Sequence, residues 1–247
     1  MHTKLTLGST LWSVLLAMML WTTAHEAPAQ ENAQRVGFAA RISGILQTTQ
    51  GAKHVSEKGD VTAGSLFGDL ELSAALSSGA SGLVLLEVAA ESRIDKHVPS
   101  FSAFNDLAEE DPTAHLAEAW IEQRWWDERA AAKVGLVDLK SGSGRNESAF
   151  DGNAVANDAA TQFLSSGFVN SLAVEFPEDN GLGFTLWLSA VDWLDFGFGL
   201  TDAQDYWERP FAHLFLIAQM DFHYSLGDLP GTYRFFTWRN NSDHERL

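Results

Sequence analysis

The 247-residue chain contains no cysteine, so disulfide frameworks, thiolate metal sites and cysteine nucleophiles are all excluded. Positive charge is also scarce, because 16 Lys and Arg residues stand against 33 Asp and Glu residues, for a net charge of −17. Such an acidic chain is a poor electrostatic partner for nucleic acid or anionic lipid headgroups. We therefore expect no nucleic-acid partner.

The sequence has one long apolar run, LWSVLLAMML at residues 11–20, which follows Lys4. This run is shorter than the roughly 20 apolar residues that a membrane helix needs. The small residues Ala27 and Ala29 behind it offer a cleavage site. The pattern predicts a secretory signal peptide over residues 1–29, followed by a single domain over residues 30–247. A protein that crosses a membrane with strands is still possible, since each strand needs only about 9–11 residues.

Motifs of catalysis and metal binding are missing as well, since no H-E-x-x-H, G-x-S-x-G or phosphate-loop pattern occurs. Glu118 and Glu122 would share one strand face about 13 Å apart. The carboxylates of glycoside hydrolases stand about 5–9.5 Å apart. We therefore expect a protein that is not an enzyme and that has no cofactor and no metal site.

What the sequence has in abundance is the alternation of apolar and polar residues. Leu70 and Leu72, for example, alternate with Asp69 and Glu71. This period of two is typical of strands with one apolar face. The pattern predicts nine strands, over residues 36–48, 66–76, 82–91, 117–127, 130–139, 182–191, 194–200, 212–224 and 230–240.

Alternation alone leaves two all-β architectures open: a soluble β-sandwich, whose apolar faces meet, and an outer-membrane barrel, whose apolar face meets lipid. Two features favour the barrel. The polar faces carry charged residues among small ones, as a water-filled lumen would tolerate. Aromatic residues also gather near predicted strand ends, as in membrane girdles: Trp125, Trp126, Trp193, Tyr206, Trp207, Tyr233 and Trp238. The alternative is a secreted β-sandwich that binds glycans without transporting them.

Five stretches together resemble one family, the carbohydrate-selective porins of Gram-negative outer membranes. They are EAWIEQRWWD (118–127), AAAKVGLVDL (130–139), FDGNAVANDAATQFLSSGFVN (150–170), FPEDNGLGFTLWL (176–188) and LGDLPGTYRFFTWRNNSDH (226–244). The resemblance covers residues 117–244 and implies an antiparallel transmembrane β-barrel in the outer membrane. It also implies passive diffusion of small sugars, contact with outer-membrane lipid and a possible homo-oligomer.

The chain departs from this family in its length. Members close a barrel of about sixteen strands, the size that keeps an aqueous channel, whereas nine strands are predicted here. We therefore expect an incomplete barrel, from a truncated product or an N-terminal portion of a porin. A chain that does not fold by itself is a further possibility, since open sheet edges are not tolerated in lipid.

Two groups of residues are expected to line the pore. The first lies on predicted strand faces, where charged groups and aromatic rings suit sugar hydroxyls and pyranose rings; the alternative is an ordinary solvated sheet face. The second lies in residues 150–170, which alternate poorly and would fold into the lumen as a loop; the alternative is an external surface loop. The candidates are Arg41, Glu118, Trp120, Glu122 and Arg124 on strands, and Asp151, Asn153, Asn157 and Asp158 in the loop. The acidity of the chain favours neutral or cationic sugars.

Overall fold

The structure is a computed structural model of the whole chain. It describes residues 36–48, 62–91, 113–140, 150, 174, 176–177, 180–203 and 210–241. These residues form nine β-strands: β1 (Val36–Thr48), β2 (Thr62–Ser77), β3 (Ala80–Glu91), β4 (Thr113–Trp125), β5 (Ala130–Val137), β6 (Gly181–Val191), β7 (Leu194–Asp202), β8 (Leu214–Leu226) and β9 (Leu229–Asn240).

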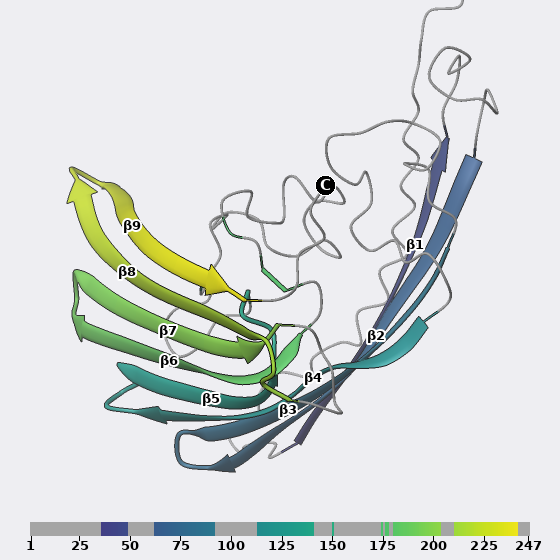
Figure 1. Cartoon of the computed structure of the whole chain (residues 1–247), viewed down its shortest axis with the longest axis horizontal. Coiled ribbons are helices and arrows are strands. Elements are labelled where there is room, and N and C mark those ends of the chain that lie inside the picture. Colours follow the sequence, from purple (N-terminus) through teal and green to yellow (C-terminus); the bar gives the residue numbers. More distant parts are fainter. Residues whose placement is uncertain are drawn as a thin grey trace, which may run out of the picture.

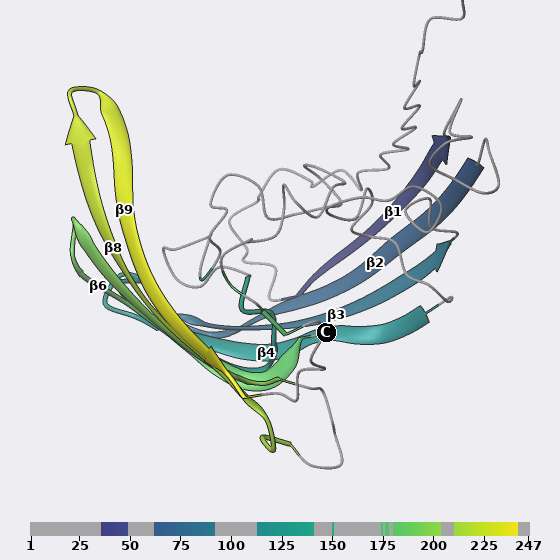
Figure 2. The same ribbon diagram turned by 45° about the horizontal axis from the view of Figure 1, so that its top comes forward.

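The nine strands make a single antiparallel sheet in which every strand pairs with its neighbours in the sequence, in the order β1 to β9. The sheet curves into a trough, with β1 to β4 on one side and β6 to β9 on the other (Figures 1 and 2). The prediction of an all-β antiparallel fold with nine strands is confirmed. The described strands do not divide into two facing sheets, so nothing supports the β-sandwich.

The connections between strands differ at the two ends of the sheet. Tight turns at residues 78–79, 126–129, 192–193 and 227–228 close one end, and the longer connections all lie at the other. Bacterial outer-membrane barrels have this arrangement, with short turns on the periplasmic side and long loops outside. None of the described segments forms a helix long and apolar enough to cross a membrane.

The register of the sheet separates two faces. On one face Arg41 pairs with Asp69, and Asp69 pairs with Glu87. Cross-strand pairing places Trp187 of β6 on this same face, and Phe150 packs against Trp187. The described pieces of chain between β5 and β6 lie inside the trough (Figure 1). This concave face is called the inner face below, and the opposite face the outer face.

The outer face is apolar and exposed, as the alternation predicted. Phe38 is 68% exposed, Val134 60% and Phe235 58%. A sheet that leaves such residues uncovered is built for an apolar surrounding. A belt of exposed aromatic residues lies at the end with the tight turns, as interfacial girdles do in membrane barrels: Trp125, Trp126, Trp193, Tyr224 and Tyr233.

Two details of the prediction are wrong. The strand predicted over residues 117–127 extends too far, because β4 ends at Trp125 and Trp126 lies in the turn with φ of 53°. Trp238 was expected in a girdle, but it stacks on Phe215 of the inner face with ring centroids 6.1 Å apart. Tyr206 and Trp207 lie outside the described residues.

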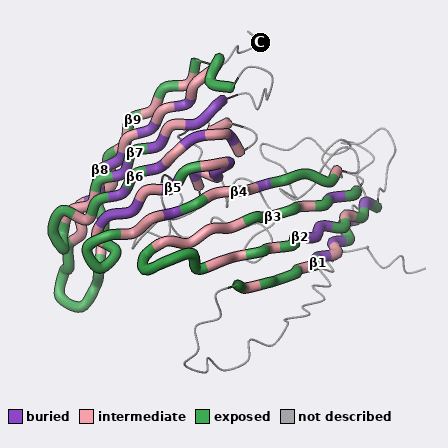
Figure 3. The backbone as a smooth tube through the Cα atoms, turned by 90° about the horizontal axis from the view of Figure 1, so that it is seen from below, coloured by how far each residue is buried: buried purple, intermediate pink, exposed green. Residues whose placement is uncertain are grey.

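Buried residues concentrate on the inner face of β5 to β8, where buried positions alternate with less buried ones along the strands (Figure 3). The core includes Trp187, Phe215 and Ile217 from these strands, with Phe150 and Val174 from the connection between β5 and β6. The curvature of the sheet therefore encloses a packed core at one part of its inner face.

Candidate functional site

The five strand residues predicted to line a pore all lie on the inner face. On β4, Glu118, Trp120, Glu122 and Arg124 alternate with outward residues. A β-bulge between β3 and β4 sets this phase, because Leu85 pairs with Glu118 while Leu86 pairs with Leu116. The extra residue lets both Glu118 and the odd-numbered His115 face inwards.

The first polar cluster lies on β4 and β5, around Trp120. The indole Nε1 of Trp120 donates a hydrogen bond of 2.8 Å to Oε2 of Glu118. The ammonium of Lys133 lies 4.5 Å from the centroid of the Trp120 ring, within the range of a cation–π interaction. The side chains of Glu118 and Lys133 therefore fix the orientation of the Trp120 ring.

Glu122 and Arg124 extend this cluster towards the tight turn. Glu122 is 1% exposed, faces Lys133 across the strand pair and accepts a hydrogen bond from Nε of Arg124. Nη1 of Arg124 also contacts Glu128 at 3.2 Å. The Arg124 side chain is 35% exposed, so it is far more accessible than the carboxylate of Glu122. We infer that Glu122 positions Arg124.

A row of charged residues crosses the first four strands at one level of the inner face. Nε of Arg41 lies 3.4 Å from Asp69, and Nε2 of His115 lies 3.6 Å from Glu87. Asp69 and Glu87 are direct cross-strand partners. The row therefore places two neighbouring carboxylates between a guanidinium at one end and an imidazole at the other, and the guanidinium of Arg41 offsets part of the repulsion between the carboxylates.

A second polar cluster lies on β8 and β9. The guanidinium of Arg234 donates to Asp221 through Nε and Nη2, each at 3.0 Å, and Gln219 donates to the same carboxylate at 3.0 Å. Asp221 is 1% exposed. The sequence analysis did not identify this pair, because the pairing of Asp221 with Arg234 depends on the register of the hairpin.

A neighbouring chain of hydrogen bonds runs across the same hairpin. Nε2 of His223 lies 2.7 Å from Asp195, and Nδ1 of His223 lies 3.0 Å from the hydroxyl of Thr232. Among the described residues, no group of three or more His, Cys, Asp or Glu side chains could hold a metal ion.

The inner face also has an apolar part, which the sequence analysis did not anticipate. Phe150 packs against Trp187 with ring centroids 4.8 Å apart. Two glycines of β7 make room for these rings: a Cβ at Gly197 would lie 2.4 Å from the ring of Trp187, and one at Gly199 would lie 3.0 Å from Phe150. The stretch DFGFG is therefore explained by close packing on the inner face, with its phenylalanines pointing outwards.

The family model of the carbohydrate-selective porins, OprB family, matches residues 69–247. The chain belongs to this porin family. A solved structure titled the high pH structure of OprB of Pseudomonas putida is similar, with a TM-score of 0.64 and 13% sequence identity. The similarity covers 84% of this chain, which spans about half (52%) of the length of that porin. No curated protein sequence matches this chain.

Membership of the carbohydrate-selective porins identifies the surroundings of the two faces of the sheet. The polar inner face corresponds to the lumen side of a porin, and the apolar outer face to the lipid side. This fold and family are those of channels rather than enzymes. The described porin sheet is open, with β1 at one edge and β9 at the other.

The predicted loop residues of this porin, Asp151, Asn153, Asn157 and Asp158, lie outside the described residues. Both sides of the segment that contains them are described. Phe150 is 1% exposed and Val174 is 5% exposed, and both belong to the inner core. The connection is also fixed where it returns to the sheet, because the side chain of Asn180 donates to the carbonyl oxygen of Ala117 at 2.9 Å.

Proposed function

We propose that this porin forms part of an outer-membrane channel through which small sugars diffuse passively. The observation that carries this proposal is the Trp120 ring on the inner face, oriented by Glu118 and Lys133, on the same strand face as the accessible guanidinium of Arg124. An aromatic face suits the C–H surface of a pyranose ring, and charged groups replace the hydrogen bonds that sugar hydroxyls lose from water.

We propose different parts for these residues. Trp120 and Arg124 of β4 would contact the sugar, together with Arg41 of β1, whose side chain is 40% exposed. Glu118 and Glu122 would act through them, because each carboxylate accepts a hydrogen bond from one of these side chains. The net charge of −17 would disfavour anionic solutes, so we propose neutral or cationic sugars.

We also propose that the segment 150–170 narrows the channel. Support comes from its anchors, since Phe150 and Val174 are buried against the inner face of the sheet. Asp151, Asn153, Asn157 and Asp158 would then present carboxylates and amides to the solute. Unchanged sugar uptake in the double variant Asp151→Ala, Asp158→Ala would support an external loop instead.

The remaining proposals concern location and assembly. The exposed apolar outer face supports contact with outer-membrane lipid, and the predicted signal peptide over residues 1–29 would direct export. Residues 1–35 lie outside the described part of the chain. We propose a homo-oligomer as a possible assembly on the basis of family resemblance alone.

Uptake of radiolabelled sugars into lipid vesicles tests the sugar proposal. We expect the Trp120→Ala variant to weaken competition between neutral sugars while the channel still passes salt. Trp125→Ala is the matched control, because Trp125 lies on the same strand but faces outwards and is 45% exposed. Identical sugar competition in both variants would contradict the role of Trp120.

A further inference from the structure

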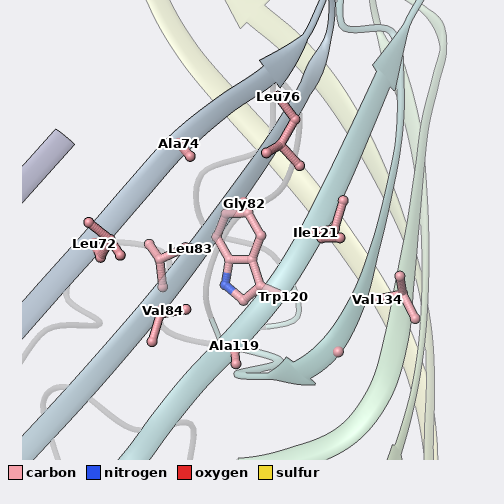
Figure 4. A pocket seen from close by; sticks show the side chains of 11 residues that line it. Leu72, Ala74, Leu76, Gly82, Leu83, Val84, Ala119, Trp120, Ile121 and Val134 are labelled. Carbon is pink, nitrogen blue, oxygen red and sulfur yellow. The ribbon is translucent and has the colours of Figure 1, made fainter. Parts of the chain in front are cut away.

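The outer face contains a hollow of about 570 Å³ across β2, β3, β4 and β5 (Figure 4). Eight of its eleven lining residues alternate to the outer face, among them Leu72, Ala74 and Val84. The other three, Leu83, Trp120 and Gly135, alternate to the inner face. The hollow therefore opens on the side opposite the proposed sugar path.

Small residues create this hollow where larger ones would fill it. Ala74 and Gly82 are cross-strand partners, and Ala119 pairs with Val84 in the adjacent row. Larger side chains stand around them, and a Cβ built at Gly82 would lie 3.7 Å from Leu76 and 3.9 Å from Ile121. The bottom of the hollow is formed by small residues, and flexible aliphatic side chains such as Leu76 and Ile121 surround it.

The chemistry of the lining selects an apolar occupant. No lining residue carries a charged side chain. The one side-chain donor is the indole of Trp120, whose Nε1 already donates to Glu118. Water in such a site would lack hydrogen-bond partners, whereas hydrocarbon gains dispersion contacts with the aliphatic rim.

The position of the hollow identifies the source of that hydrocarbon. It lies near the tight turns, since Leu76 is next to the turn at residues 78–79 and Ile121 is about 13 Å along the strand from Trp125. The belt that includes Trp125 and Trp126 marks the membrane interface at this end. The tight turns of bacterial barrels lie on the periplasmic side.

We propose that this hollow holds an acyl chain of a phospholipid from the periplasmic leaflet of the outer membrane. The proposal rests on the membrane location of the porin family but not on sugar transport. The hollow is continuous with the exposed apolar outer face, including Leu70 and Leu86, so lipid reaches it without any rearrangement of the sheet. An acyl chain bound in the hollow lies closer to the sheet than the acyl chains around it. It therefore exchanges with the surrounding lipid more slowly.

Photochemical cross-linking tests this proposal on the full chain in vesicles of phosphatidylethanolamine and phosphatidylglycerol. A fraction of the phospholipid carries a diazirine in an acyl chain, and mass spectrometry of the digested protein locates the adducts. We expect adducts in excess at Leu76 and Ile121 relative to the outward residues Phe196 and Phe198 of β7. An even distribution over the outer face would overturn the proposal.

Filling the hollow with larger side chains provides a second test of the lipid proposal. The double variant Ala74→Leu, Ala119→Leu should lose the excess of adducts, whereas the control Ala40→Leu, Ala190→Leu adds the same groups at outward positions elsewhere and should keep it. If the filled variant does not show the heat-modifiable migration of the parent, Ala119→Val replaces it. An excess that persists in the filled variant would overturn the proposal.

A second copy of the chain is the competing occupant. Because the chain has no cysteine, Ala119→Cys introduces a single thiol at the hollow. Covalent dimers that form at this thiol in preference to one at Ala40→Cys would overturn the lipid proposal in favour of a protein interface. Sugar uptake is measured on the same samples, so failure of the transport proposal and failure of the lipid proposal give different results.

Discussion

Removal of the Phe150 ring should destabilise the protein through the inner core. Phe150 is 1% exposed and packs on Trp187 at 4.8 Å between ring centroids, and it also faces Gly199, which cannot fill the space. Replacement of a fully buried phenylalanine by alanine costs about 3–5 kcal/mol. The contact between the two rings accounts for about 0.5–1.5 kcal/mol of this beyond area burial.

Urea unfolding of the Phe150→Ala variant in lipid vesicles measures this loss, and the change in tryptophan emission relative to the parent, to which Trp187 contributes, follows the core. We expect a lower free energy of unfolding, a shift of emission to longer wavelength and faster cleavage by trypsin after Lys140. Phe235→Ala is the control, because Phe235 faces outwards and should leave both the emission and the cleavage unchanged. A loss below about 1 kcal/mol for Phe150→Ala would refute the packing argument.

Two further predictions concern the inner face of the sheet. Gly197→Ala should cost about 1–3 kcal/mol in the free energy of unfolding, because its Cβ would overlap a tryptophan ring, while Gly44→Ala has no atom within 4 Å to meet and should change stability little. Asp221→Ala should cost about 3–5 kcal/mol because it removes the buried carboxylate that Arg234 and Gln219 contact. Asp192→Ala breaks an ion pair in which the aspartate is 84% exposed, so it should cost at most about 1 kcal/mol. Gly44→Ala is the control for Gly197→Ala, and Asp192→Ala is the control for Asp221→Ala. An equal loss in the free energy of unfolding for a variant and its control would contradict the packing or ion-pair argument for that site.

The sequence predicted the strands and their faces well because alternation is a local signal. The first strand was placed at its observed bounds, Val36–Thr48, and Glu118, Trp120, Glu122 and Arg124 share a face as expected. The pattern is reliable here because one face meets an apolar surrounding, so that a slip of one residue would turn charges outwards.

Contacts that depend on register or on distant segments could not be predicted in this way. The ion pair of Asp221 and Arg234 requires the alignment of β8 with β9. The inner core requires Phe150, in the long connection between β5 and β6, to pack on Trp187 of β6, and no local pattern indicates this contact. The bulge beside Ala117 changed the phase of β4 and brought His115 to the inner face, which alternation from Glu118 alone would have placed outside.

Single-channel recording in a planar lipid bilayer tests the central claim most directly. The full chain is added at constant voltage, and a small neutral sugar is then titrated into the bath. The account predicts discrete current steps that the sugar reduces in a concentration-dependent manner, with a weaker reduction in the Trp120→Ala variant. The absence of steps, or steps that sugars leave unchanged, would contradict a sugar channel lined by the inner face of this sheet.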